Sequence, residues 1–392
     1  MRQPSRPLNR FAYVCGDPGV PIPGHKGASI HVASVCKALR RRGLDGEVHA
    51  VCAEGSELHG LPIKPISLPE RRKRKSVEER EARLFLASLG SSLSLDARPD
   101  FIYERYSLWH AGGLARARDL GIPFVLEVNS PLPIEAQRFR SLANPALAEG
   151  LAQVLLWEAD AIVCVSEEVA QWVEKRRGHR EGVWTIPNGV DPEIFFPNPG
   201  VRPPELPQQS PLIAFSGSFR PWHGLDDLLD AVRILAQRID DVHLVCVGDG
   251  PTRLAAEERA RDLRIEHRVH FTGQLPHHEV PRWLQGADVL VAPYPVLSDF
   301  YFSPLKIFEF LALEIPVVAT ASGQIPALIP DRERGFLCAP GVPDALATRI
   351  EDVIRSPSEA RAIAANAREW VLRNATWEAR VGDLLQRIGA LS

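Results

Sequence analysis

Short apolar runs alternate with helical segments along nearly the whole chain, and this alternation limits the possible folds more than any other feature. It predicts βαβ units, and therefore parallel sheets whose strands are connected through helices. The expected strands form two sets: 11–15, 46–52, 101–103, 124–128, 161–165 and 183–186 in the first, and 212–216, 243–247, 269–272, 289–292, 317–320 and 335–337 in the second.

The length of the chain and a proline-rich gap predict two domains. A chain of 392 residues is longer than a single hydrophobic core usually supports. Residues 196–211, between the two sets of strands, are rich in proline and are expected to form a linker. We therefore expect an α/β protein with two Rossmann-like domains, residues 1–200 and 201–373, whose parallel sheets face each other across a cleft. A helix expected in 374–392 would pack back on the first domain.

Composition and charge exclude several classes of protein. The net charge of −3 gives no reason to expect nucleic-acid binding, and the six cysteines are scattered without C-x-x-C spacing. The N-terminus lacks the apolar core of a signal peptide, and no apolar run approaches the roughly 20 residues that span a bilayer. We therefore expect a cytoplasmic protein with reduced cysteines.

The sharpest charge cluster in the chain is residues 70–75, which read Glu-Arg-Arg-Lys-Arg-Lys. One interpretation is a patch for an anionic lipid head group or another phosphorylated ligand, which would place the protein at the inner face of a membrane. The other interpretation is an ordinary solvated loop.

Residues 303–312 carry the most informative chemistry. Lys306 and Glu309 lie three positions apart at the start of an apolar helix, so their side chains share one face. The N-terminus of a helix favours anions through its free N–H groups and its dipole. A cation for phosphate beside a carboxylate for a sugar diol would bind a nucleotide sugar. The alternative is an exposed ion pair on a surface helix.

A glycine-rich loop, residues 16–29, follows the first expected strand and precedes the first expected helix. Backbone N–H groups in such a loop can surround an anion, and this loop contains Lys26 and Gly27. Ser29 is expected to be the N-cap of the helix. The alternative is a long irregular turn.

Several motifs in a fixed order resemble those of one family, the retaining family-four glycosyltransferases of the GT-B fold. The resemblance covers nearly the whole chain. The motifs are Ala-Asp-Ala-Ile-Val-Cys-Val-Ser at 159–166, Ile-Pro-Asn-Gly-Val-Asp at 186–191, the loop 215–225, Val-Gly-Asp-Gly-Pro at 247–251, Phe-Thr-Gly at 271–273, and 303–312 with Pro-Val-Val-Ala at 316–319.

The resemblance implies transfer of a sugar from a nucleoside diphosphate to an acceptor, with the anomeric configuration retained. In that scheme Glu309 binds the ribose hydroxyls, and Arg220 and Lys306 neutralise the diphosphate. Gly27 would bring its N–H group to the same phosphates. No metal or other cofactor is implied, and the chain lacks a D-x-D motif. The other donor contacts that it implies are His223, Gly250, Ser303, Pro304 and Leu305.

The chain departs from the family pattern at three places. Tyr301 stands where many relatives carry a glutamate that touches the donor sugar, and Asp299 is the candidate substitute. His223 replaces a common lysine, and it could donate to phosphate or cap a helix. Asn129 stands where relatives often carry a histidine, and it could bond a sugar hydroxyl. Glu127 could polarise an acceptor hydroxyl, so Asn129, Glu127 and Asp299 are the catalytic candidates.

On the acceptor side the candidates are Arg105 and Lys26. Arg105 ends an expected strand, and its alternative role is an ion pair with Glu104 or Glu127. The expected partners are a nucleotide-sugar donor and a small-molecule, glycan or lipid-linked acceptor, without nucleic acid. The residues do not distinguish UDP, GDP and ADP donors. Two other functions stay open, a nucleotide-sugar epimerase on the same fold and a non-catalytic sugar-nucleotide-binding subunit.

Overall fold

The computed structural model describes residues 7–67, 76–90, 93–139, 141–198, 202–297 and 299–391. The chain forms two compact units. The first comprises Met1–Asn188, Tyr301–Ser303 and Trp377–Ser392, and the second comprises Gly189–Phe300 and Pro304–Thr376. Each unit is an α/β domain built on a parallel sheet, which confirms the predicted fold class.

The first unit contains an eight-stranded sheet in the order β3-β4-β2-β1-β5-β6-β7-β8. All paired strands are parallel except β3 and β4. The strands are β1 (Arg10–Cys15), β2 (Asp45–Ala50), β3 (Glu57–Leu58), β4 (Leu61–Pro65), β5 (Phe101–Arg105), β6 (Phe124–Val128), β7 (Ala161–Cys164) and β8 (Val183–Thr185).

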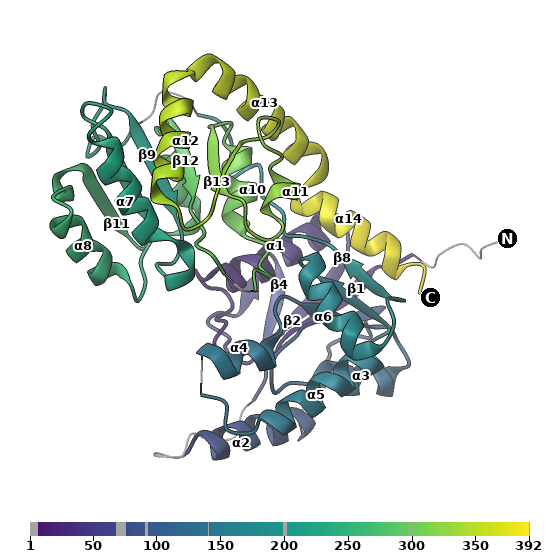
Figure 1. Ribbon diagram of the computed structural model, residues 1–392. Helices are drawn as coiled ribbons and strands as arrows, with labels where there is room; N and C mark the ends of the chain where they lie inside the picture. Colours follow the sequence, from purple (N-terminus) through teal and green to yellow (C-terminus); the bar gives the residue numbers. More distant parts are fainter. Residues whose placement is uncertain are drawn as a thin grey trace. The chain divides into compact units, whose positions relative to one another are not determined.

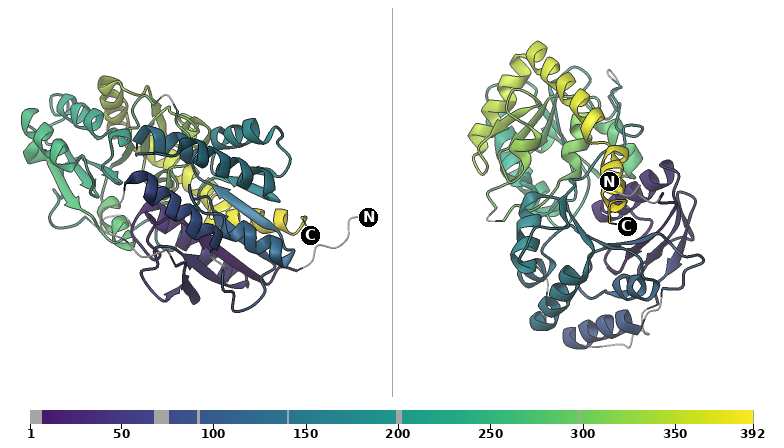
Figure 2. Two further views of the ribbon diagram at one scale, coloured as in Figure 1. Left: turned by 90° about the horizontal axis from the view of Figure 1, so that it is seen from below. Right: turned by 90° about the vertical axis from the view of Figure 1, so that its right-hand side faces the viewer.

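Alternation of side chains along the strands divides the core of the first unit between the two faces of the sheet. Phe124, Leu126 and Val128 of β6 pack in a hydrophobic cluster with α3, α5 and α6, whereas Glu127 points to the other face. There α14 packs along α1 (Figure 2). The helices of this unit are α1 (Gly27–Arg41), α2 (Val77–Gly90), α3 (Gly112–Leu120), α4 (Leu132–Phe139), α5 (Pro145–Glu158), α6 (Glu167–Arg177) and α14 (Trp377–Ile388).

The second unit contains a six-stranded sheet in the order β11-β10-β9-β12-β13-β14, with every pair parallel. Its strands were all predicted, to within a residue or so at each end, because each is a compact apolar run. They are β9 (Leu212–Ser216), β10 (His243–Val247), β11 (Val269–Gly273), β12 (Val289–Ala292), β13 (Val317–Thr320) and β14 (Phe336–Cys338).

Helices cover the second sheet and place their N-termini near the carboxyl ends of its strands. α7 and α12 lie side by side (Figure 1), and α9 and α10 contact β9, β10 and β12. The helices are α7 (Leu225–Leu235), α8 (Arg253–Asp262), α9 (Val280–Leu284), α10 (Leu305–Ala312), α11 (Ile325–Leu328), α12 (Pro343–Arg355) and α13 (Pro357–Asn374), with 3-10 turns η1 (Pro221–His223), η2 (Glu266–Arg268) and η3 (His277–Glu279).

The described part of the proline-rich segment is held by Arg202 and belongs to the second unit, so it is not a loose linker. The Arg202 guanidinium donates to the carbonyl oxygens of Gly286 at 2.6 Å and of Pro207 and Ser210 at 2.7 Å. It also pairs with the Asp288 carboxylate at 2.9 Å. The main segment of the first unit ends at Asn188, before the expected boundary at residue 200.

Two local expectations were wrong. β4 was not predicted, because Pro62 and Pro65 interrupt its apolar pattern, yet it pairs with β2 near the edge of the sheet, where proline is tolerated. Helix α1 begins at Gly27, with Lys26 at the N-cap position. Ser29 therefore lies in the first turn of the helix and is not its N-cap.

The basic cluster 70–75 lies outside the described residues. In the part of the chain that the structure describes, none of the helices combines the length and the apolar character needed to cross a membrane.

Candidate functional site

Helix α10 carries Lys306 and Glu309 into the interior of the second unit. Lys306 and Glu309 are each only 8% exposed, and every residue from Lys306 to Ala312 is buried. The alternative of an exposed ion pair on a surface helix is therefore wrong. The other residues from Ile307 to Ala312 are apolar and are buried together with the two charged ones.

The Lys306 ammonium lies over aromatic rings at the carboxyl ends of two neighbouring strands. Its Nζ is 4.2 Å from the centre of the Phe215 ring and 5.4 Å from that of Tyr294. Among the described residues it has no hydrogen-bond partner. Burial lowers the pKa of Lys306 to about 7, and the Glu309 carboxylate offsets this only in part. Near neutral pH the buried amine is therefore protonated only in part, and among the described residues no carboxylate is hydrogen-bonded to it.

Gly217 keeps the space beside this ammonium open. Its φ is +151°, and a Cβ built there would lie 2.8 Å from Lys306 Nζ and 3.3 Å from His223 Nδ1. His223 ends η1 and makes no side-chain cap to α7, so the predicted capping alternative is not observed. Burial, followed by the charge of Lys306, lowers the pKa of His223 well below its ordinary value. The imidazole is therefore neutral at pH 7.

Glu309 is held by a histidine from η3. His277 Nε2 lies 2.7 Å from Glu309 Oε1, and the His277 ring lies 5.1 Å from the ring of Phe195. Burial alone would lower the pKa of His277, but the carboxylate of Glu309, with a smaller contribution from Asp191, raises it above 6.5. The contact with Glu309 therefore favours the protonated form of the His277 ring.

The remaining predicted residues of the second unit lie on loops after its strands. Arg220 is exposed, with its guanidinium 5.8 Å from the centre of the Trp222 ring. A Cβ at Gly250 would lie 2.6 Å from the backbone of Phe219, so only glycine fits there. Pro304 is the N-cap of α10, Leu305 is its first residue, and Asp299 is exposed on the preceding loop.

The segment Tyr301–Ser303 is anchored within the first unit. The backbone N–H of Asn188 donates to Ser303 Oγ at 3.0 Å, and its side-chain amide donates to the Ser303 carbonyl oxygen at 2.5 Å. Ser166 Oγ donates to the Tyr301 carbonyl oxygen at 2.8 Å, and the Tyr301 hydroxyl donates to Glu135 at 3.2 Å. Tyr301 therefore has a structural role at the position where the resemblance led us to expect a glutamate.

Glu127 is the centre of a buried charge network at the end of β6. Its Oε1 lies 2.9 Å from Arg105 Nη1 and accepts a hydrogen bond from Asn129 Nδ2 at 2.5 Å. Its Oε2 lies 2.9 Å from His31 Nε2, and His31 Nδ1 lies 2.8 Å from Asn188 Oδ1. The network joins strands β5 and β6 to helix α1.

These contacts decide the alternatives for Arg105 and correct one expectation for Glu127. Arg105 pairs with Glu127, whereas Glu104 pairs with His110 at 2.7 Å. Burial would raise the pKa of Glu127, but His31 and Arg105 lower it to about 2. Glu127 is 1% exposed and both of its oxygens are occupied, so it does not reach an acceptor directly. Asn129, which is partly exposed, is the accessible end of the network.

Gly27 and Lys26 lie at the start of α1 in the first unit, and both are exposed. Lys26 Nζ donates to the carbonyl oxygen of Gly19 at 2.8 Å, which fixes the side chain across its own loop. The phosphate contact of Gly27 and the acceptor contact of Lys26 stay predictions.

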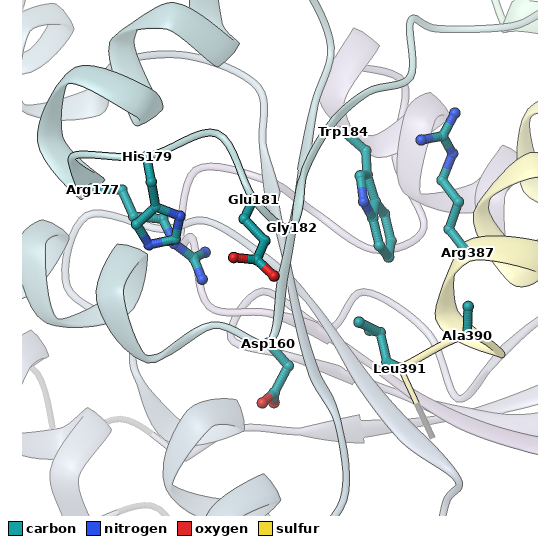
Figure 3. Close-up of a pocket in the computed structure, with 9 residues that line it drawn as sticks. All are labelled: Asp160, Arg177, His179, Glu181, Gly182, Trp184, Arg387, Ala390 and Leu391. Atoms are coloured by element: carbon teal, nitrogen blue, oxygen red, sulfur yellow. The ribbon is translucent and has the colours of Figure 1, made fainter. Parts of the chain in front are cut away.

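A hollow of about 390 Å³ lies at the opposite, amino edge of the first sheet (Figure 3). Asp160 and Gly182 on its wall precede β7 and β8, whereas Asn129 follows the carboxyl end of β6. Several of its charged groups are bonded within the unit: Arg177 Nη2 donates to the carbonyl oxygen of Ala159 at 3.1 Å, Asp160 pairs with Arg118 at 3.0 Å and Arg387 pairs with Asp383 at 2.8 Å. We therefore assign the site to the surroundings of α10.

Within the described ranges, no group of three or more His, Cys, Asp or Glu side chains is arranged to hold a metal ion. Metal independence itself stays a prediction.

Two family descriptions match consecutive parts of the chain. Residues 25–194 match the family described as "Glycosyltransferase Family 4", and residues 201–370 match that described as "Glycosyl transferases group 1".

Individual relatives agree with these matches. Over 266 residues, 65% of this chain and 66% of the relative, the chain is 29% identical to a GDP-mannose-dependent alpha-(1-6)-phosphatidylinositol monomannoside mannosyltransferase of Mycolicibacterium smegmatis. The match spans 62% of the corresponding Mycobacterium tuberculosis protein, so it covers slightly less than two thirds of these relatives. A D-inositol 3-phosphate glycosyltransferase of Corynebacterium diphtheriae is 26% identical over 91% of this chain and 88% of its own length.

Solved structures share the fold over almost the full length. The sucrose-phosphate synthase of Thermosynechococcus elongatus superimposes with a TM-score of 0.74 at 22% identity, covering 98% of this chain and 100% of that one. Anabaena HepE in complex with UDP-glucose superimposes with a TM-score of 0.72 at 18% identity, covering 96% and 99%.

The structure adds residues that sequence reasoning did not assign. His277 and Asn188 had no predicted role, although Asn188 lies in the Ile-Pro-Asn-Gly-Val-Asp motif. His277 pairs with Glu309, which is 32 positions away in the sequence. His31 pairs with Glu127, which is 96 positions away. No local pattern reports such a contact.

Proposed function

We propose that this chain, which belongs to the family-four glycosyltransferases of the GT-B fold, transfers a sugar from a nucleoside diphosphate to an acceptor with retention of configuration and without a metal ion. The observation that carries the proposal is the buried Lys306 ammonium without a hydrogen-bond partner in the described residues. Burial makes the charged form of Lys306 costly unless an anion lies beside it. The position of this side chain therefore favours an anion-binding site.

The neighbouring groups suggest how the donor is divided among them. Lys306, together with Arg220 on the adjoining loop, would bind the diphosphate, and the neutral imidazole of His223 would donate one hydrogen bond to it. Gly217 leaves room for a phosphate oxygen beside the ammonium. Glu309, one turn further along α10, would accept hydrogen bonds from the ribose hydroxyls. Carboxylates suit such diols because each oxygen can accept from a different hydroxyl.

Lys306 would also act during the chemical step. The bond between the anomeric carbon and the diphosphate oxygen breaks, and the acceptor oxygen bonds to that carbon from the same face. The acceptor proton passes to the leaving phosphate, so no protein nucleophile is needed. As negative charge grows on the diphosphate, the pKa of Lys306 rises again and the ammonium stabilises that charge. Asp299 and the backbone of 303–305 remain the candidates for the donor sugar.

The acceptor is proposed to bind the first unit. Asn129 would offer its amide oxygen, because Nδ2 already donates to Glu127. Arg105 and Glu127 would hold Asn129 in place. Two relatives are named for phosphatidylinositol mannosides and inositol 3-phosphate. A lipid-linked or phosphorylated polyol is therefore the first acceptor class to test, and GDP-mannose is the first donor.

A ligand screen followed by turnover tests this proposal. Thermal shifts with UDP, GDP, ADP and their sugars should reveal one preferred base, because a ligand that binds the native state raises Tm. Lys306→Ala and Glu309→Ala should abolish transfer and leave the circular dichroism spectrum unchanged. Glu369→Ala removes half of an exposed Glu–Arg pair on α13 and serves as the matched control.

Two results would contradict the proposal. Wild-type turnover by Lys306→Ala on the preferred donor would remove Lys306 from the site. Conversion of the donor sugar without any acceptor would instead indicate an epimerase.

A further inference from the structure

The imidazole of His277 contacts the Glu309 carboxylate at hydrogen-bond distance, 2.7 Å from Nε2 to Oε1. It comes from η3, directly after β11, whereas Glu309 comes from α10. The two elements thus meet at the group that the proposed function assigns to the ribose.

We propose that His277 is a positioning residue that orients Glu309 toward the ribose of the donor. The inference rests on the proposed function, because it concerns the same carboxylate. A carboxylate offers about four acceptor positions, so the imidazole uses one and leaves the others for two hydroxyls. A glutamate side chain has several rotatable bonds, and fixing one oxygen before the ligand arrives reduces the entropy lost on binding.

The surroundings of His277 favour its contact with Glu309. The charged groups that face the ring are Glu309 on α10 and Asp191 on the segment that precedes Phe195, and both are acidic. The Phe195 ring packs on the imidazole at 5.1 Å and limits its rotation. The charges of Glu309 and Asp191 raise the pKa of His277 and so favour the protonated ring, which strengthens its hydrogen bond to Glu309.

The next residue in the chain provides a matched control. His278 is exposed, and its nearest carboxylate, that of Glu279, is 3.9 Å away. His278→Ala therefore removes an imidazole from the same turn without touching Glu309.

The experiment compares three ligands by calorimetry in wild type, His277→Ala, His277→Gln and His278→Ala. The ligands are the preferred nucleoside diphosphate, its 2′,3′-dideoxy analogue and inorganic pyrophosphate. In His277→Ala the affinity for the ribose ligand should fall about tenfold or more, the value of one charge-assisted hydrogen bond, while pyrophosphate binding stays unchanged. The preference for ribose over dideoxyribose should shrink by the same factor. His278→Ala should match wild type.

Two further readouts separate positioning from a general structural role. His277→Ala should raise KM for the donor with little change in kcat. His277→Gln keeps an N–H donor at a similar distance from Glu309, so it should recover most of the preference for ribose. In wild type that preference should fall as pH rises through the pKa of His277, and in His277→Gln it should not change with pH.

The outcomes distinguish this inference from the proposed function. If wild type prefers ribose and His277→Ala keeps the same preference, the positioning role is wrong and the proposed function stands. An equal loss for pyrophosphate would also overturn the positioning role, because it would indicate a collapsed site. If wild type binds neither nucleoside diphosphate nor pyrophosphate, the proposed function fails first.

Discussion

Replacing Glu127 by glutamine tests whether this carboxylate is the centre of a buried charge network or an accessible catalytic group. The substitution keeps the shape of the side chain and removes its charge. Arg105 and His31 would then remain buried against an uncharged amide, at side-chain exposures of 13% and 7%.

Two estimates of the cost agree. Removing one partner of a buried ion pair usually costs about 3–5 kcal/mol, because the other charge is left without compensation. The pKa of Glu127, about 2 in the folded protein against an ordinary 4.5, corresponds to about 3 kcal/mol at 1.36 kcal/mol per unit. We therefore expect Glu127→Gln to lower the free energy of unfolding of the first unit by about 3 kcal/mol.

The pH dependence has a definite sign. A carboxyl group whose pKa is lower in the folded protein stabilises the fold above its unfolded pKa, and that contribution is lost as pH falls from about 4.5 toward 2. Wild type should therefore lose stability through this window, and Glu127→Gln should lose about 3 kcal/mol less over the same window.

Hydrogen exchange measured by mass spectrometry resolves the two units, which a single unfolding curve need not do. Amides of β5, β6 and β7 should lose protection, and those of β9 and β10 provide the internal reference. Glu158→Gln, which removes an exposed pair with Arg118, should change protection by less than about 0.5 kcal/mol. A loss below about 1 kcal/mol in Glu127→Gln would refute the network and favour direct contact with the acceptor.

Two more predictions concern the donor site. The pKa of Lys306 is about 7 in the free protein and should rise when phosphate binds. Binding of a nucleoside diphosphate at pH 8 should therefore take up close to one proton, which calorimetry in buffers of different ionisation enthalpy measures. Binding to Lys306→Arg should take up none, because arginine stays protonated. Gly217→Ala should weaken nucleotide binding and destabilise the fold by about 1–3 kcal/mol, because its Cβ would lie 2.8 Å from Lys306 Nζ at a φ of +151°. Gly43 has a φ of +87°, and a Cβ built there has nothing within 4 Å. Gly43→Ala should therefore destabilise the fold but leave the nucleotide affinity unchanged. An equal loss of affinity in both variants would contradict the role of Gly217.

The sequence was sufficient for most of the fold because strands of a parallel sheet are buried on both faces and therefore read as continuous apolar runs. β9, β10, β12 and β13 have the predicted bounds. The pairing of Lys306 with Glu309 on one helical face was also predictable, since their spacing is local.

Side-chain partners across elements were not predictable in the same way. The pairing of Glu127 with Arg105 was one of the expected alternatives, but His31 had no predicted role because it lies 96 positions away from Glu127 in the sequence. The proline-rich segment was predicted to be a linker from its composition. Composition does not show the hydrogen bonds by which the Arg202 guanidinium holds this segment to the second unit. These contacts depend on tertiary packing.

The position of α14 in the chain has a consequence for synthesis on the ribosome. This helix completes the first unit, where Trp377 lies 5.1 Å from His31 and Val381, Leu384 and Ile388 are buried. It is translated roughly 200 residues after Asn188, the end of the main part of that unit. At a synthesis rate of about 5–20 residues per second, the apolar surface that α14 buries stays exposed for about 10–40 s after Asn188 is added. Nascent chains of the first unit should therefore bind chaperones until α14 emerges.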